Sequence, residues 1–181
     1  MHFHLINEHM VEERLVGHEI HLEKCPVGLP AEDNFQLVKV YIPELKDGEF
    51  LVRNIWISVD LYMRGRMRGT KSYISPFQIG KPLEGRCIGR ITKSKNDQFK
   101  VGDYVLGNLG WREYWLSDGS RSDIMKIDPN LAPIQWYLGI LGLTGLTGAY
   151  VGLLKIAQLV DNSNSTIFVS AAAGAVGSMA C

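Results

Sequence analysis

The stretch Thr166-Ile-Phe-Val-Ser-Ala-Ala-Ala-Gly-Ala-Val-Gly177 decides how the end of this chain is interpreted. Its first five residues are mainly apolar and β-branched, which predicts a short buried strand over 166–170. The small residues that follow predict a turn that opens a helix, with Ala172 in the first glycine position of a G-x-G-x-x-G pattern. In that pattern, backbone N–H groups at the start of the helix hold the pyrophosphate of a dinucleotide.

This turn supplies five candidate cofactor-binding residues: Ala173, Gly174, Ala175, Val176 and Gly177. Gly174 would let the backbone approach a phosphate, and Gly177 would let the helix pack close to the strand. The alternative is a turn of small residues between a buried strand and a buried helix, without a ligand. A doubly wound cofactor domain needs two βαβαβ halves, so we expect 133–181 to be the beginning of such a domain and the chain to be the N-terminal part of a longer enzyme.

The composition is that of a globular protein with a neutral surface. Apolar residues make up 46% of the 181 residues, and 19 basic residues balance 19 acidic ones. There is therefore no overall field that would attract nucleic acid or an anionic membrane, and no apolar run approaches the roughly 18 residues of a membrane span. Cys25, Cys87 and Cys181 are odd in number and far apart, which indicates free thiols and a reducing, cytoplasmic location.

The segment between Gly17 and Ile127 alternates between apolar and polar residues in short runs separated by turn residues. Such runs predict strands at 17–22, 35–41, 49–58, 83–91, 98–107 (turn, then strand), 111–116 and 124–127. Six or seven short strands with turns between them predict a mainly β fold, a partly open barrel or a sandwich.

The apolar spacing becomes helical after Pro133. Glycines at 142, 145 and 148 predict two helical pieces that are joined at a bend. We therefore divide the chain into an N-terminal extension (1–16), a β-domain (17–132), and linking helices followed by the first strand and turn of an incomplete cofactor domain (133–181).

Two further motifs could each be either a ligand site or a solvated surface segment. Gly17-His-Glu19 has the composition of a metal motif, but nearby residues supply no other ligands, so we expect His18 and His21 to be solvated strand positions. The segment 60–69 contains three arginines and two glycines. It could be a loop that binds phosphate or substrate, although a solvated charged turn is the interpretation we favour.

Four segments carry a resemblance to a known family: Ser58-Val-Asp-Leu-Tyr-Met-Arg-Gly-Arg-Met67, Val101-Gly-Asp followed by Tyr-Val-Leu, Leu141-Gly-Leu-Thr-Gly-Leu-Thr-Gly-Ala-Tyr150, and Ala171 to Gly177. Together they resemble the medium-chain dehydrogenase/reductase superfamily, and most closely its zinc-independent 2-alkenal, prostaglandin and curcumin-type reductases. The resemblance implies a GroES-like β-domain followed by a Rossmann domain, with the substrate cleft between them. Leu83 and Ser58 stand where the zinc-using branch has ligands, and the lobe with four cysteines is absent, so we expect no metal.

The resemblance also implies an activity. Its members use NADP(H) to reduce the carbon–carbon double bond of α,β-unsaturated aldehydes and ketones. By position in the matching segments, Tyr62 would be the catalytic residue that lines the cleft, and Thr144 would lie near the nicotinamide. The expected partner is a small enal or enone, with a homodimer as a candidate assembly. The alternatives are a quinone reductase of the same superfamily, or a non-catalytic GroES-like module that binds a partner.

Overall fold

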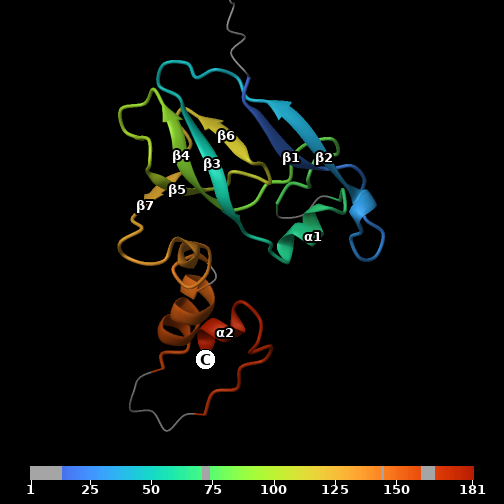
Figure 1. Cartoon of the computed structure of the whole chain (residues 1–181). Helices are drawn as coiled ribbons and strands as arrows, with labels where there is room; N and C mark the ends of the chain where they lie inside the picture. The colour runs from blue at the N-terminus through green and yellow to red at the C-terminus, as the bar shows by residue number, and fades with distance from the viewer. Residues whose placement is uncertain (1–13, 71–73, 144, 160–165) are drawn as a thin grey trace, which may run out of the picture.

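The computed structural model describes residues 14–70, 74–143, 145–159 and 166–181, so that Thr144 lies outside the described residues. Seven strands form two antiparallel sheets in these residues (Figure 1), which confirms the prediction of a mainly β fold. The strands are β1 (Val16–Leu22), β2 (Phe35–Tyr41), β3 (Phe50–Ile57), β4 (Cys87–Ser94), β5 (Tyr104–Gly107), β6 (Tyr114–Ser117) and β7 (Met125–Ile127).

The smaller sheet pairs β1 with β2 in register from Val16 opposite Tyr41 to Leu22 opposite Phe35. A short 3-10 helix, η1 (Glu32–Asn34), leads into β2. The larger sheet has the strand order β6-β3-β4-β5-β7. Isolated bridges from Glu19 to Arg112 and from His21 to Pro82 connect β1 with segments that flank the larger sheet.

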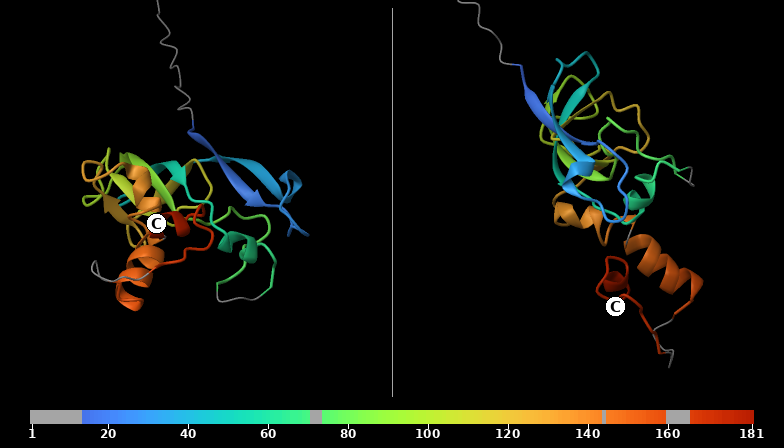
Figure 2. Two further views of the ribbon diagram at one scale, coloured as in Figure 1. Left: turned by 90° about the horizontal axis from the view of Figure 1, so that it is seen from below. Right: turned by 90° about the vertical axis from the view of Figure 1, so that its right-hand side faces the viewer.

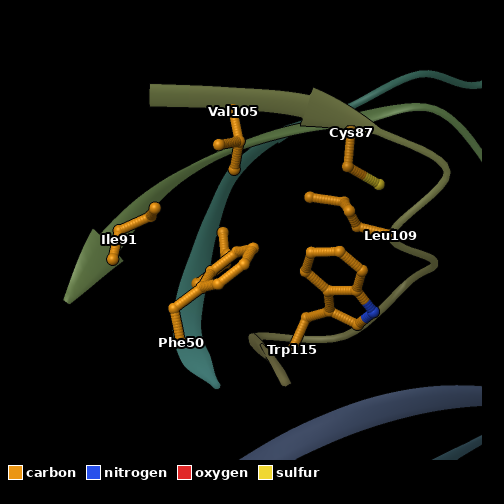
Figure 3. Close-up of a cluster of buried hydrophobic side chains, with 7 residues drawn as sticks. Phe50, Cys87, Ile91, Val105, Leu109 and Trp115 are labelled. Carbon is orange, nitrogen blue, oxygen red and sulfur yellow. The ribbon is translucent and has the colours of Figure 1, made fainter. Parts of the chain in front are cut away.

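The main core lies on the larger sheet and is shown in Figure 3. Phe50 is fully buried there, stacks on Phe99 with ring centroids 4.5 Å apart, and meets Trp115 edge to face at 6.3 Å. The members of this core are Phe50, Val52, Cys87, Ile91, Val105, Leu109 and Trp115. Because they come from β3, β4, β5 and β6 and the loops between them, burying them fixes the sheet as one unit.

A second cluster, which we call the α1 cluster, joins the smaller sheet to a short helix, α1 (Tyr62–Arg66). Its buried members are Leu22, Met63, Met67, Phe77 and Leu83. The expectation that 60–69 is a loop is therefore wrong. Burial of Met63 and Met67, which are four positions apart on one helix face, favours the helix although glycine and arginine dominate the segment.

The fourth predicted strand begins later than expected, at Cys87 rather than residue 83. Gly85 lies where a Cβ atom would come within 2.6 Å of the Met63 side chain and 3.2 Å of the Trp111 indole nitrogen. The chain at 83–86 therefore packs against α1 and the loop at Trp111 before it enters the ladder.

Two helical pieces follow the β-domain, as the spacing after Pro133 predicts. A 3-10 helix, η2 (Ile134–Leu138), packs on β4, β5 and β7, and a π-type helix, η3 (Gly145–Ile156), follows. The strand expected over 166–170 is wrong, because these residues pair with no strand in the described part of the chain. A strand needs a hydrogen-bonded neighbour, and an apolar β-branched run alone does not supply one.

A final short helix, α2 (Gly177–Ala180), lies beside η3. The views in Figures 1 and 2 agree that α1 is at the end of the β-domain that faces this C-terminal segment. Among the described residues, no helix is long and apolar enough to cross a membrane.

Candidate functional site

Tyr62 is the first residue of α1 and is held by the segment that precedes it. The Ser58 hydroxyl donates to the Asp60 carboxylate at 2.7 Å, and the Asp60 carbonyl accepts from the Met63 N–H at 3.0 Å. The Ser58 N–H donates to the Arg86 carbonyl at 2.8 Å. These bonds attach the start of α1 to the segment that enters β4, which fixes the backbone that carries Tyr62.

The Tyr62 side chain is half-buried and packs against the α1 cluster. Burial raises the pKa of its phenol above the ordinary value of 10.0, and the negative charge of Asp60 raises it further. Arg66 and Arg86 oppose that shift with their positive charges. The net direction is upward, so Tyr62 carries its proton at neutral pH and can donate a hydrogen bond.

The arginines of α1 are structural rather than free. Arg64 donates to the carbonyls of Pro26 and Gly28, at 3.2 Å and 2.6 Å for its NH2 group. Arg66 donates to the Ser75 carbonyl and to the Glu84 carboxylate. Neither interpretation weighed for this segment from the sequence, a phosphate grip or a solvated turn, describes these two side chains, because carbonyls and a carboxylate from distant segments hold them. No local pattern predicts these contacts, since the partners belong to other segments that meet α1 only in the fold.

The two histidines of β1 are each bonded to a carboxylate. His18 Nδ1 lies 3.0 Å from Glu113 Oε2 at an exposed position. His21 Nε2 lies 2.8 Å from Glu19 Oε2, and Glu19 is also paired with Arg112 at 3.4 Å. The expectation of a solvated strand position is wrong for His21, because both its side chain and that of Glu19 are only 14% exposed.

The positions matched to zinc ligands have other roles in this chain. Leu83 is fully buried in the α1 cluster, and the Ser58 hydroxyl is bonded to Asp60. Within the described residues, no three side chains of His, Cys, Asp or Glu are grouped so that they could hold a metal ion. The Cys87 thiol is buried between the carbonyls of Gly85 and Gly110, and burial raises its pKa to about 12.

The candidate dinucleotide turn lies in one exposed loop before α2. The Gly174 N–H donates to the Ala171 carbonyl at 2.8 Å, and the Ser178 N–H donates to the Gly174 carbonyl at 2.9 Å. A Cβ atom at position 177 would lie 2.2 Å from the Ala171 carbonyl oxygen, so the turn requires Gly177. The residues from Ala173 to Val176 are exposed and Gly177 is partly exposed, which fits the close approach of a phosphate group.

The predicted residues thus lie in two segments. The five turn residues are together in the C-terminal segment, and Tyr62 packs within the β-domain. Tyr62 therefore lies before the predicted domain boundary at residue 132, and the turn residues lie after it.

Comparison with known families decides how this arrangement is classified. Residues 18–127 match the sequence family described as the N-terminal domain of oxidoreductase. The chain belongs to this family. The matched range runs from β1 to the end of β7 and includes α1 with Tyr62.

Individual proteins of this family are similar over most of the chain. YfmJ of Bacillus subtilis, provisionally named as an NADP-dependent oxidoreductase, is 48% identical over 160 residues, which are 88% of this chain and 45% of that protein. The NADP(+)-dependent 2-alkenal reductase of Nicotiana tabacum is 33% identical over 92% of this chain and 49% of its own length. The crystal structure of CurA from Vibrio vulnificus in complex with NADPH superimposes with a TM-score of 0.79 and 38% identity, covering 90% of this chain and 47% of CurA.

These comparisons confirm the resemblance drawn from the four sequence segments. The chain spans about half the length of the curated relatives it matches.

Proposed function

We propose that the complete protein to which this chain belongs is an NADPH-dependent reductase of the carbon–carbon double bond in α,β-unsaturated aldehydes and ketones. The observation that carries the proposal is a half-buried, protonated tyrosine at the start of α1, in a family whose tobacco member is named a 2-alkenal reductase. The NADPH in the CurA complex supports the choice of cofactor.

The chemistry requires a hydrogen-bond donor at the carbonyl oxygen of the substrate. Bound NADPH would supply a hydride to the β-carbon; the carbonyl oxygen would carry the negative charge of the resulting enolate, and a proton from solvent would then add to the α-carbon. Tyr62 would donate its phenolic hydrogen to that oxygen, and its raised pKa keeps this hydrogen in place at neutral pH. The bonds of Ser58 to Asp60 and Arg86 hold the donor in position before the charge develops.

The cofactor contacts in this proposal come from the turn and from the segment before η3. Ala173, Gly174, Ala175, Val176 and Gly177 would line the pyrophosphate, with backbone N–H groups of this turn as donors other than that of Gly174, which donates to the Ala171 carbonyl. Thr144 would lie near the nicotinamide, by its place in the segment that resembles the superfamily.

The test measures NADPH consumption by the complete protein with a trans-2-alkenal and, in parallel, with p-benzoquinone. We expect turnover with the alkenal, and we expect Tyr62→Phe to lower kcat by about 10- to 100-fold because one donor to the developing oxyanion is lost. Tyr41→Phe is the matched control, since Tyr41 is 65% exposed on β2. Turnover of the quinone alone would replace the proposal with a quinone reductase, and no turnover of either would favour a non-catalytic module.

A further inference from the structure

We propose that Arg66 is a positioning residue, which clamps α1 to the segment 75–84 and so fixes the place of the Tyr62 hydroxyl. The inference rests on the proposed function of Tyr62. It starts from an unusual feature of the short helix α1: its last residue is an arginine whose side chain is only 11% exposed.

Arg66 holds the 75–84 segment through two nitrogens and the face of its guanidinium group. Its Nε donates to the Ser75 carbonyl at 2.8 Å, and its NH2 donates to Glu84 Oε2 at 2.7 Å. Its Cζ lies 4.1 Å from the centre of the Phe77 ring, within the range of a cation–π contact. The Arg66 carbonyl accepts from the Phe77 N–H at 2.9 Å. One residue therefore contacts three points of the segment through different interactions.

The clamp reaches Tyr62 along the helix. Tyr62 and Arg66 are four positions apart, so they lie on the same face of α1. Phe77, which the guanidinium covers, is a buried member of the α1 cluster, against which Tyr62 packs. A shift of the 75–84 segment would therefore change the packing on which the position of Tyr62 depends.

Backbone hydrogen bonds attach the same segment to β1. The Gly80 N–H donates to the Leu22 carbonyl at 2.8 Å, and the Leu83 N–H donates to the Ile20 carbonyl at 3.0 Å. Toward α1, the segment is held by the burial of Phe77 and Leu83 in the α1 cluster and by the contacts of Arg66, and a cavity of about 680 Å³ lies beside those contacts.

Arg66 also acts on Tyr62 by its charge. The charged groups that act on the phenol are Asp60, Arg66 and Arg86, and the Cys87 thiol acts on it only when it is ionised. Arg66 lowers the pKa of Tyr62 while Asp60 raises it. Loss of the positive charge at position 66 therefore removes one of the two charges that lower the Tyr62 pKa.

The first test is steady-state kinetics of the complete protein with a trans-2-alkenal and NADPH. Arg66→Gln should lower kcat by about 10- to 100-fold, since a displacement of about 1 Å in a catalytic group costs rates of this order, with KM for NADPH unchanged. Glu84→Gln should lower kcat by about 3- to 10-fold and keeps the fold, because the Glu84 side chain is 55% exposed. Arg68→Gln, at an exposed arginine just beyond α1, is the control and should stay within about twofold of wild type.

The second test does not depend on activity. The ionisation of Tyr62 is followed by NMR of ¹³C-labelled tyrosine, and exchange of the Phe77 amide hydrogen is measured on the same samples. Arg66→Gln should raise the Tyr62 pKa and accelerate Phe77 exchange. Arg66→Lys keeps the charge but cannot form the planar fork, so it should accelerate Phe77 exchange as Arg66→Gln does and raise the Tyr62 pKa less than Arg66→Gln does.

The outcomes separate the clamp from the proposed reaction. The positioning role is overturned if the wild-type enzyme reduces the alkenal and the Arg66 variants match it in kcat, Tyr62 titration and Phe77 exchange. The proposed function is overturned, and the clamp is kept, if the wild-type protein is inactive but the Arg66 variants change titration and exchange as expected.

Discussion

The β-domain and the C-terminal segment differ in how far their apolar side chains are buried. In the β-domain, Phe50, Leu22 and Leu83 are fully buried. Between 133 and 181, none of the side chains whose burial is described is buried, and Phe168 is 90% exposed. The C-terminal segment is the more apolar of the two regions in sequence, so its exposed apolar side chains reflect a lack of packing partners rather than a polar composition. The antiparallel strands find theirs within the described chain, and the segment 166–169 does not.

The contrast shows where local pattern is sufficient to specify structure. A strand that pairs with a neighbour a few residues away needs only the alternation and the turn between them, as for β1 and β2. A parallel strand needs neighbours that arrive through crossover connections. The predictions below begin with the largest expected difference between the two regions.

The largest effect should follow from truncating one large aromatic residue in each region. Phe50→Ala removes a fully buried ring that contacts Phe99 and Trp115, and should lower the free energy of unfolding by about 3–5 kcal/mol. Phe168→Ala should change it by less than about 0.5 kcal/mol, because the ring is already in water. Urea unfolding of both variants of this chain measures the difference, and equal losses would contradict the contrast.

A methyl group added inside the larger sheet should have the next largest effect. The Cβ of Gly89→Ala would lie 2.3 Å from Val52 Cγ1 and 2.8 Å from the Arg53 carbonyl oxygen in the paired strand β3. We expect a loss of about 1–3 kcal/mol from overpacking. Gly65→Ala, in α1, meets no atom within 4 Å and should be neutral or stabilising, since alanine favours helix. Thermal unfolding measures the stability of both variants. A Gly89→Ala protein as stable as wild type would contradict the expected overpacking between β3 and β4.

The cysteines of the two regions should differ in reactivity. Cys87 is buried with its pKa raised to about 12, and Cys181 is exposed. Iodoacetamide at pH 8 should therefore modify Cys181 and leave Cys87 intact, as peptide mass spectrometry would show.

The same thiol makes stability depend on pH in the alkaline range. The pKa of Cys87 is higher in the folded state than in the unfolded state, so the neutral thiol favours the folded state. This contribution to the free energy of unfolding is complete below the ordinary pKa of 9.0 and is lost as the pH rises toward about 12. The loss approaches about 1.4 kcal/mol per pH unit inside that window. Cys87→Ser keeps a hydroxyl donor and should remove this slope, and an unchanged slope in urea titrations at pH 9 to 10.5 would assign it to another group.

The smallest effect concerns a surface pair in the β-domain. Lys126 Nζ lies 2.6 Å from Asp103 Oδ2 and lowers the pKa of that carboxyl group. The pair is partly exposed, so Asp103→Asn should cost no more than about 1 kcal/mol. Its contribution is present above the ordinary carboxyl pKa and is lost as the pH falls through the lowered value. Asp97→Asn breaks the more exposed pair with Lys100 and is the control. It should have no measurable effect on stability above or below the carboxyl pKa.

Much of the β-domain could be predicted from the sequence, because its signals are local. The bounds of β2 and the turn that precedes β5 follow from alternation and from glycine at position 102, whose φ is +97°. The helix α1 could not be predicted, since what stabilises it is the distant α1 cluster rather than an apolar period of its own. Tyr62 came from the resemblance, and Arg66 was missed as a clamp because Ser75, Phe77 and Glu84 meet it only in the fold.

The most direct test of the proposed reaction is the transfer of deuterium by the complete protein from NADPH labelled at the reactive nicotinamide carbon to a trans-2-alkenal. The product is analysed by NMR. We predict a saturated aldehyde with deuterium on its β-carbon. An allylic alcohol with deuterium on the former carbonyl carbon would contradict double-bond reduction, as would a product without deuterium.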